Sequence, residues 1–236
     1  MEPTIVLVHG AFAESASWDG VVDTLLETSH PVIAAANPLR GLASDAAAIS
    51  DLVATIDGPV VLVGHSYGGM VITNVSPDAG EITGLVYVAA FAPKAGESAF
   101  TLAGMCPGST LGEALEPTPR ADGLTDLTII RDRFHAQFCA DVPAAQAARM
   151  AITQRPVTQE ALVEPSGDPL WKHVPSWFVW GEEDRNIPAA LEHHMAERAG
   201  GRRRIEVPGA SHALSVAHPR ATAHLIREAA ALHAVA

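Results

Sequence analysis

The ten residues Val61–Met70, VLVGHSYGGM, decide the fold of this chain. An apolar run leads into Ser66, which has one glycine two residues before it and another two residues after it. This G-x-S-x-G pattern is typical of a nucleophile elbow, a tight strand-to-helix turn in which only small flanking residues avoid a backbone clash. A helix N-cap serine on an ordinary loop is the alternative interpretation. The stretch therefore predicts a strand, a sharp turn and a helix, with Ser66 as a candidate nucleophile.

Short apolar segments alternate with amphipathic ones on both sides of this stretch. Strands that alternate with helices pair in parallel and are joined by right-handed crossovers. The expected strands are residues 4–8, 31–35, 60–63, 82–90, 176–180 and 204–207. The expected helices begin near Trp18, at Ser44 as an N-cap, after Ser66, at Ala189 and near Arg220, and the last of them reaches Ala234. The order predicts one α/β core.

Residues 98–173 interrupt this alternation with many prolines. One helix is expected near Thr125 to Cys139, and another after Asp141-Val142-Pro143, with Pro143 at its first position. An insert of this size inside a compact domain is usually functional. We therefore expect residues 1–97 and 174–236 to form the core, and residues 98–173 to form an inserted helical cap.

Composition narrows the class of protein. The chain has 236 residues, 48% of them hydrophobic, which suffices for one sizeable core. A net charge of −12 argues against nucleic acid or an anionic membrane as the main partner. Cys106 and Cys139 lack metal-ligand spacing, so neither a disulfide framework nor a metal site is expected. Without a membrane-length apolar run or a signal-peptide pattern, a cytoplasmic protein is expected.

A serine nucleophile needs a base, and the base needs an orienting carboxylate. Active groups of a parallel sheet lie on loops at the carboxyl ends of its strands. Asp184 in GEEDRNIP and His212 in PGASHALS follow two expected strands there. The chain order Ser66, Asp184, His212 is that of an α/β-hydrolase catalytic triad. Glu97, after the fourth expected strand, is the rival acid.

Two backbone N–H groups should form an oxyanion hole, one at Tyr67 after the nucleophile and one at Ala11 after the first strand. His9 is expected to hydrogen-bond the loop backbone rather than to transfer protons. Candidate substrate-binding residues are Phe12, His135 and Phe138, and packing alone is the alternative for His135. These groups complete the chemistry, so we expect no metal and no cofactor.

Together these motifs resemble the α/β-hydrolase superfamily over essentially the whole chain. The similarity is carried by His9–Phe12, Gly64–Gly69, Gly181–Pro188 and the pair Ser211-His212. It is greatest to small cap-bearing members, a group that includes plant methylesterases, hydroxynitrile lyases and bacterial esterases. The resemblance implies a three-layer fold with about six mainly parallel strands and a helical cap, without the family's antiparallel N-terminal strand pair.

The resemblance also favours one reaction. A serine at position 66 excludes the aspartate nucleophile of the family's dehalogenases and epoxide hydrolases. Plant lyases carry a threonine and a lysine where this chain has Gly10 and Ala213. We therefore expect a serine hydrolase that cleaves small, mostly apolar carboxylic esters or lactones through an acyl-enzyme. A cofactor-free lyase or oxygenase on the same site and a non-catalytic small-molecule receptor are the alternatives, and the oligomeric state stays open.

Overall fold

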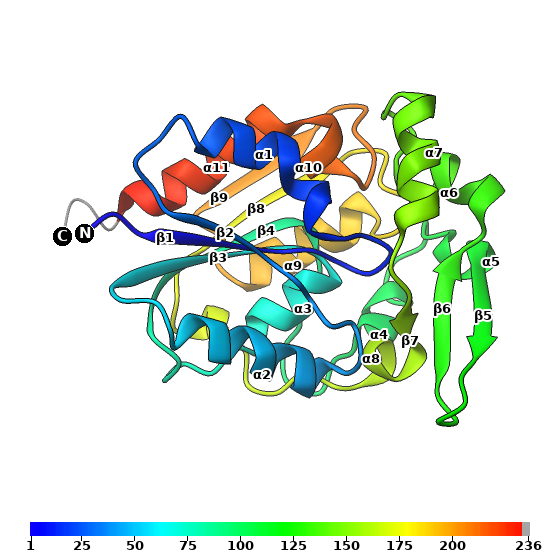
Figure 1. Cartoon of the computed structure of the whole chain (residues 1–236), viewed down its shortest axis with the longest axis horizontal. Coiled ribbons are helices and arrows are strands. Elements are labelled where there is room, and N and C mark those ends of the chain that lie inside the picture. Colours follow the sequence, from blue (N-terminus) through cyan, green and yellow to red (C-terminus); the bar gives the residue numbers. More distant parts are fainter. Residues whose placement is uncertain (233–236) are drawn as a thin grey trace.

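The computed structural model describes residues 1–232 and contains the expected parallel sheet (Figure 1). Its strand order is β2-β1-β3-β4-β8-β9, and every neighbouring pair is parallel. The strands are β1 (Thr4–Val8), β2 (Val32–Ala35), β3 (Pro59–Ser66), β4 (Glu81–Ala90), β8 (Ser176–Gly181) and β9 (Arg203–Val207). The prediction of six mainly parallel strands is confirmed.

Helices cover both faces of the sheet (Figure 1). One face carries α1 (Asp19–Leu25), preceded by a 3-10 turn (Ser15–Trp18), with α10 (Leu214–Ala217) and α11 (Pro219–Ala231). The other carries α2 (Leu42–Val53), α3 (Tyr67–Thr73) and α9 (Ala189–Arg198). Side chains of a strand alternate between faces, so Ile5 and Leu7 join the core under α1 and α11, while Val6 and Val8 join the other core. Two apolar layers therefore sandwich the sheet.

The expected start of α2 at Ser44 is wrong. The helix begins at Leu42 with Gly41 as its N-cap, and the Ser44 hydroxyl donates a hydrogen bond to the Gly41 carbonyl. The carboxylate of Glu164 caps the helix instead, because it accepts hydrogen bonds from the amides of Leu42 (2.5 Å) and Ala43 (3.3 Å). A cap that comes from so distant a residue leaves no local signal. The expected end of the last helix, Ala234, lies outside the described residues.

Residues 98–173, which we call the cap segment, come after β4 and before β8 in the chain. They lie near the carboxyl ends of the parallel strands (Figure 1). Its helices are α4 (Ala99–Ala103), α5 (Leu111–Ala114), α6 (Arg131–Phe138), α7 (Ala144–Thr153) and α8 (Gln159–Val163), followed by a 3-10 turn (Leu170–Lys172). An antiparallel sheet joins β5 (Leu115–Pro119), β6 (Thr125–Ile129) and β7 (Val157–Thr158). The cap segment is thus helical only in part.

The helix expected near Thr125 to Cys139 is wrong over its first five residues. These residues form β6, which pairs with β5 and buries Leu127 and Ile129 on one face. The pairing is possible although β5 contains two prolines, because β5 is an edge strand that need not donate on both sides. The expected helix begins only at Arg131, and the next one begins at Ala144, with Pro143 as its N-cap.

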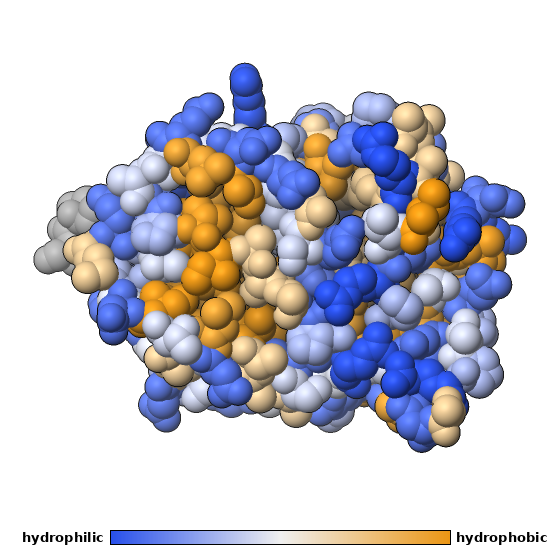
Figure 2. Space-filling view, viewed as in Figure 1, coloured by the Kyte–Doolittle hydropathy of each residue, from blue (hydrophilic) through white to orange (hydrophobic). Residues whose placement is uncertain are grey.

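One face of the molecule carries apolar residues beside the edge strand β2 (Figure 2). Figure 2 shows apolar residues gathered in a band over the face where the edge strand β2 lies, and Val32 and Ile33 of β2 are partly exposed. The edge is only four residues long, which limits pairing with another chain. No helix within residues 1–232 is long and apolar enough to span a membrane.

Candidate active site

The elbow at Ser66 is a sharp turn between β3 and α3. Ser66 has φ 54° and ψ −122°, a backbone conformation that costs energy for a residue with a side chain. A Cβ on Gly64 would lie 2.6 Å from the carbonyl oxygen of Gly68, and a Cβ on Gly68 would lie 2.4 Å from that of Val8. Both glycines of the pattern are therefore required by close backbone approach, as the sequence predicts.

The loop after β1 lies against the elbow. A Cβ on Gly10 would come within 2.6 Å of the Ser66 Cβ, so only glycine fits there. The Ala11 amide makes no backbone hydrogen bond among the described residues, and Tyr67, as the first residue of α3, has no intrahelical acceptor for its amide. By contrast, the Phe12 amide donates to the Arg155 carbonyl (3.2 Å). The two amides predicted for the oxyanion hole therefore have no backbone partner among the described residues, and the oxyanion hole stays a prediction.

Asp184 and His212 form a fully buried pair. The distance from His212 Nδ1 to Asp184 Oδ2 is 2.6 Å, and neither side chain is exposed. The other carboxylate oxygen, Oδ1, accepts hydrogen bonds from the amides of Asn186 (2.7 Å) and Ile187 (2.9 Å). This fixes the carboxylate, and it leaves His212 Nε2 without a partner among the described residues. An imidazole held in this way can accept a proton at Nε2.

His65 and Phe138 complete the surroundings of His212. The Nε2–H of His65 donates to the His212 carbonyl (3.0 Å), and burial lowers the pKa of His65 to about 3, which keeps it neutral. The Phe138 ring stands edge-on to the His212 ring, with centroids 5.0 Å apart. Sequence analysis missed the role of His65, because its partner lies 147 residues away.

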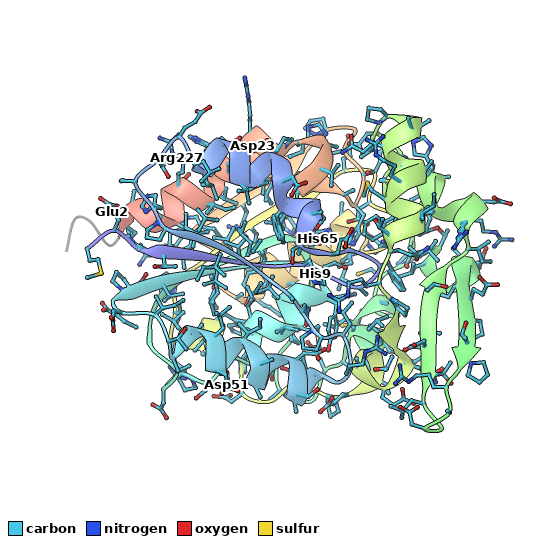
Figure 3. All side chains as sticks on the ribbon, viewed as in Figure 1. Glu2, His9, Asp23, Asp51, His65 and Arg227 are labelled. Atoms are coloured by element: carbon cyan, nitrogen blue, oxygen red, sulfur yellow. The ribbon has the colours of Figure 1, made fainter. Side chains whose placement is uncertain are left out.

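His9 serves the loop backbone, as predicted. Its Nε2 accepts from the Asn37 amide (3.1 Å), so its Nδ1 carries the proton and donates to the Gly10 carbonyl (2.9 Å). Burial lowers the pKa of His9 to about 4, in agreement with this neutral form. Figure 3 labels His9 and His65, which lie together where β1 and β3 end toward the cap segment.

The rival acid Glu97 is engaged elsewhere. Its carboxylate accepts two hydrogen bonds from the Arg198 guanidinium, at 2.8 and 2.5 Å, and one from the Lys94 amide (3.0 Å). Burial alone would raise the pKa of Glu97, but the hydrogen bonds from Arg198 and Lys94 outweigh it and lower the pKa. The structure does not bring Glu97 to His212.

The three candidate substrate-binding residues lie in different surroundings. Phe138 packs on His212, whereas the His135 Nε2 is bonded to the Val142 carbonyl within the cap segment (2.8 Å). Phe12 is buried and lines a groove of about 290 Å³ between the loop after β1 and helix α7. Met150 of α7 and Val216 of α10 also line this groove. Of the three, Phe138 and Phe12 adjoin groups of the candidate site.

Glu192 of α9 is a buried carboxyl group that sequence analysis missed. Its exposed fraction is 1%, and its Oε1 has no hydrogen-bond partner among the described residues. Burial, and after it the charge of Asp184, raises the pKa of Glu192 well above its ordinary value. Asp184 accepts three hydrogen bonds, whereas Glu192 Oε1 accepts none among the described residues, so no donor stabilises an ionised Glu192 at that oxygen.

We expect Glu192→Gln to stabilise the fold increasingly as pH rises. In the wild type, the raised pKa of Glu192 makes the fold less stable as the pH rises above the ordinary pKa of 4.5, because the carboxyl group ionises first in the unfolded chain. The gain in Tm over the wild type should be near zero at about pH 4 and at least about 3 °C at about pH 8. Thermal melts across this range measure it, with Glu197→Gln on the exposed side of the same helix as the control. A gain that does not change with pH would contradict this account.

Comparisons with known proteins identify the family of this chain. The model of the alpha/beta hydrolase family matches residues 5–225. The chain is 26% identical to the alpha/beta hydrolase nvfD of Aspergillus novofumigatus, covering 98% of this chain and 97% of that protein. It is also 26% identical to the pyrethroid hydrolase of Sphingobium wenxiniae, covering 95% and 86%. The crystal structure of polyneuridine aldehyde esterase shares the fold, with a TM-score of 0.81, 18% identity and coverage of 97% and 99%. This chain belongs to the alpha/beta hydrolase family.

Proposed function

We propose that this protein is a serine hydrolase of small, mostly apolar carboxylic esters or lactones. The observation that supports this most is the buried Asp184–His212 pair, in which His212 Nε2 has no partner among the described residues. The loop of His212 lies beside the elbow, because the His212 carbonyl accepts a hydrogen bond from His65, the neighbour of Ser66. The names of two similar proteins, a pyrethroid hydrolase and polyneuridine aldehyde esterase, also support ester hydrolysis. The groove lined by Phe12, Met150 and Val216 offers apolar contacts to a substrate, and its other lining residues include polar and charged ones such as Arg149 and Gln154.

The reaction would proceed in two halves. In the first, Ser66 Oγ attacks the acyl carbon while His212 Nε2 takes its proton, and the amides of Ala11 and Tyr67 stabilise the oxyanion. His212 then returns the proton to the leaving alcohol, which leaves an acyl-enzyme at Ser66. In the second half, water attacks the acyl carbon while His212 Nε2 takes its proton. His212 then returns the proton to Ser66 Oγ, and the carboxylic acid leaves. Asp184 holds the imidazole with Nδ1 protonated throughout.

The lyase alternative has less support. A lyase of this family uses a lysine after the catalytic histidine, and this chain has Ala213 there, which is almost fully buried. Ala213 carries no charge that could stabilise a leaving cyanide. A receptor would not need the hydrogen bonds that hold Asp184 and His212 in one orientation.

The test is activity and covalent labelling of the wild-type protein. We expect hydrolysis of p-nitrophenyl esters, with a preference within a series of graded acyl lengths, because the groove is of limited volume. A serine-directed phosphonate should stop the hydrolysis by labelling one site, and digestion should place the label on the peptide that contains Ser66. Absence of both hydrolysis and labelling would overturn the proposed function in favour of a receptor.

A further inference from the structure

A single aspartate of the cap segment holds the loop that carries His212. Asp141 lies between α6 and α7. It accepts hydrogen bonds from the hydroxyl of Ser211 and from the Ser211 amide, the latter at 3.2 Å. It also accepts one from Nε2 of His218 (3.0 Å). One carboxylate thus binds the residue just before His212 and the residue that follows α10.

These contacts are the only hydrogen bonds of the Ser211 side chain and amide within residues 1–232. Ser211 is 3% exposed, so solvent would not readily replace a lost partner, and a buried polar group without one is costly. Hydrogen bonds to a charged acceptor are also stronger than neutral ones. The amide and the hydroxyl of Ser211 are therefore held by the cap segment, whereas the carbonyl of the preceding Ala210 accepts a hydrogen bond from the core amide of Glu183 (3.0 Å).

The other contacts of His212 leave this role unfilled. Asp184 fixes its Nδ1, His65 fixes its carbonyl, and Phe138 packs on its ring. None of these three contacts holds the amide or the hydroxyl of Ser211, the residue on the N-terminal side of His212. Because a shift of about 1 Å in a catalytic group can cost about 100-fold in rate, an anchor at this point has catalytic consequences.

We propose that Asp141 is a positioning residue, which acts through Ser211 to keep the His212 imidazole aimed at Ser66. The cap segment then contributes to proton transfer as well as covering the site. This inference rests on the proposed function, since it assigns Asp141 a part in the same reaction.

The chain offers a matched control in Asp126, a second aspartate that ties the cap segment to the core. Asp126 of β6 binds Arg40, which follows β2, at 2.5 Å. It also binds Arg120 at 3.2 Å. It makes no contact with the loop of His212. Asp126→Asn therefore weakens attachment of the cap segment without touching the proposed anchor.

We expect Asp141→Ala to lower kcat about 10- to 100-fold while KM changes less than about threefold. Asp141→Asn keeps one oxygen for Ser211 and should retain activity within about tenfold of the wild type. Asp126→Asn should stay within about twofold. Combining Ser211→Ala with Asp141→Ala should lower kcat little further, because both changes break the same contact.

Hydrogen exchange of the wild type and the variants gives a reading that needs no turnover. The backbone amides of residues 209–214 should exchange at least about tenfold faster in Asp141→Ala, and their exchange should be unchanged in Asp126→Asn. Unchanged kcat and exchange in Asp141→Ala, or equal effects of Asp126→Asn, would overturn the inference. A wild type that hydrolyses no ester defeats the proposed function instead, and the exchange rates still decide whether Asp141 holds the loop. Should Asp141→Ala not fold, Asp141→Asn and Ser211→Ala carry both measurements.

Discussion

Ser66→Ala is expected to lower kcat for ester hydrolysis about 10⁴- to 10⁶-fold, as the loss of a triad nucleophile does elsewhere. The effect is chemical, because alanine keeps the Cβ and therefore bears the same backbone strain at φ 54°. The contact between Gly10 and the Cβ of residue 66 also remains. What is lost is the oxygen that attacks the acyl carbon. Initial rates on the best p-nitrophenyl ester, with the fold checked by circular dichroism, measure the loss.

A second serine provides the comparison for this variant. Ser44→Ala removes an exposed hydroxyl whose hydrogen bond is to the Gly41 carbonyl, and it should leave the rate unchanged within about twofold. Phosphonate labelling should vanish in Ser66→Ala and persist in Ser44→Ala. Labelling and full activity in Ser66→Ala would contradict both the proposed esterase function and the lyase alternative, since both need the Ser66 hydroxyl oxygen.

The sheet could be predicted from sequence because its strands carry local signals. Thr4–Val8 is buried on both faces, so it reads as a continuous apolar run. The small sheet of the cap segment carries no such signal. The two prolines of Leu115–Pro119 indicate a loop. Thr125–Ile129 becomes a strand only because it pairs with Leu115–Pro119. Pairing between segments is a property of the tertiary structure, and no local pattern contains it.

The same distinction separates what was found at the site from what was missed. Ser66 ends a strand of the parallel sheet, and Asp184 and His212 each follow one, so topology predicts that they meet. The contact of Asp141 with Ser211 joins residues 70 positions apart. Asp141 lies in the cap segment and does not follow a strand of the parallel sheet, so the topology of the sheet does not predict where it lies. The burial of Glu192 likewise depends on how α9 packs, which its polar neighbours in sequence obscure. Supporting residues therefore needed the structure.

Asp184→Asn is expected to lower kcat about 10³- to 10⁴-fold. The amide oxygen of the asparagine would take the place of Oδ1, since the amides of Asn186 and Ile187 both require an acceptor there. The NH₂ group would then face Nδ1 of His212 and favour the tautomer protonated at Nε2. That tautomer cannot accept the Ser66 proton. Steady-state kinetics measure the loss, which should appear mainly in kcat because Asp184 is buried behind the imidazole.

The matched variant for this test is Glu97→Gln, which also replaces a carboxylate by an amide. Glu97 is bound to Arg198 and not to His212, so the rate should stay within about tenfold of the wild type. Its cost should appear in Tm, because Arg198 would keep its charge beside a neutral partner. If Glu97→Gln abolished activity and Asp184→Asn did not, the orienting acid would follow β4 instead of β8. The assignments of Ser66 and His212 would survive that result, because they also rest on the elbow after β3 and on the loop after β9.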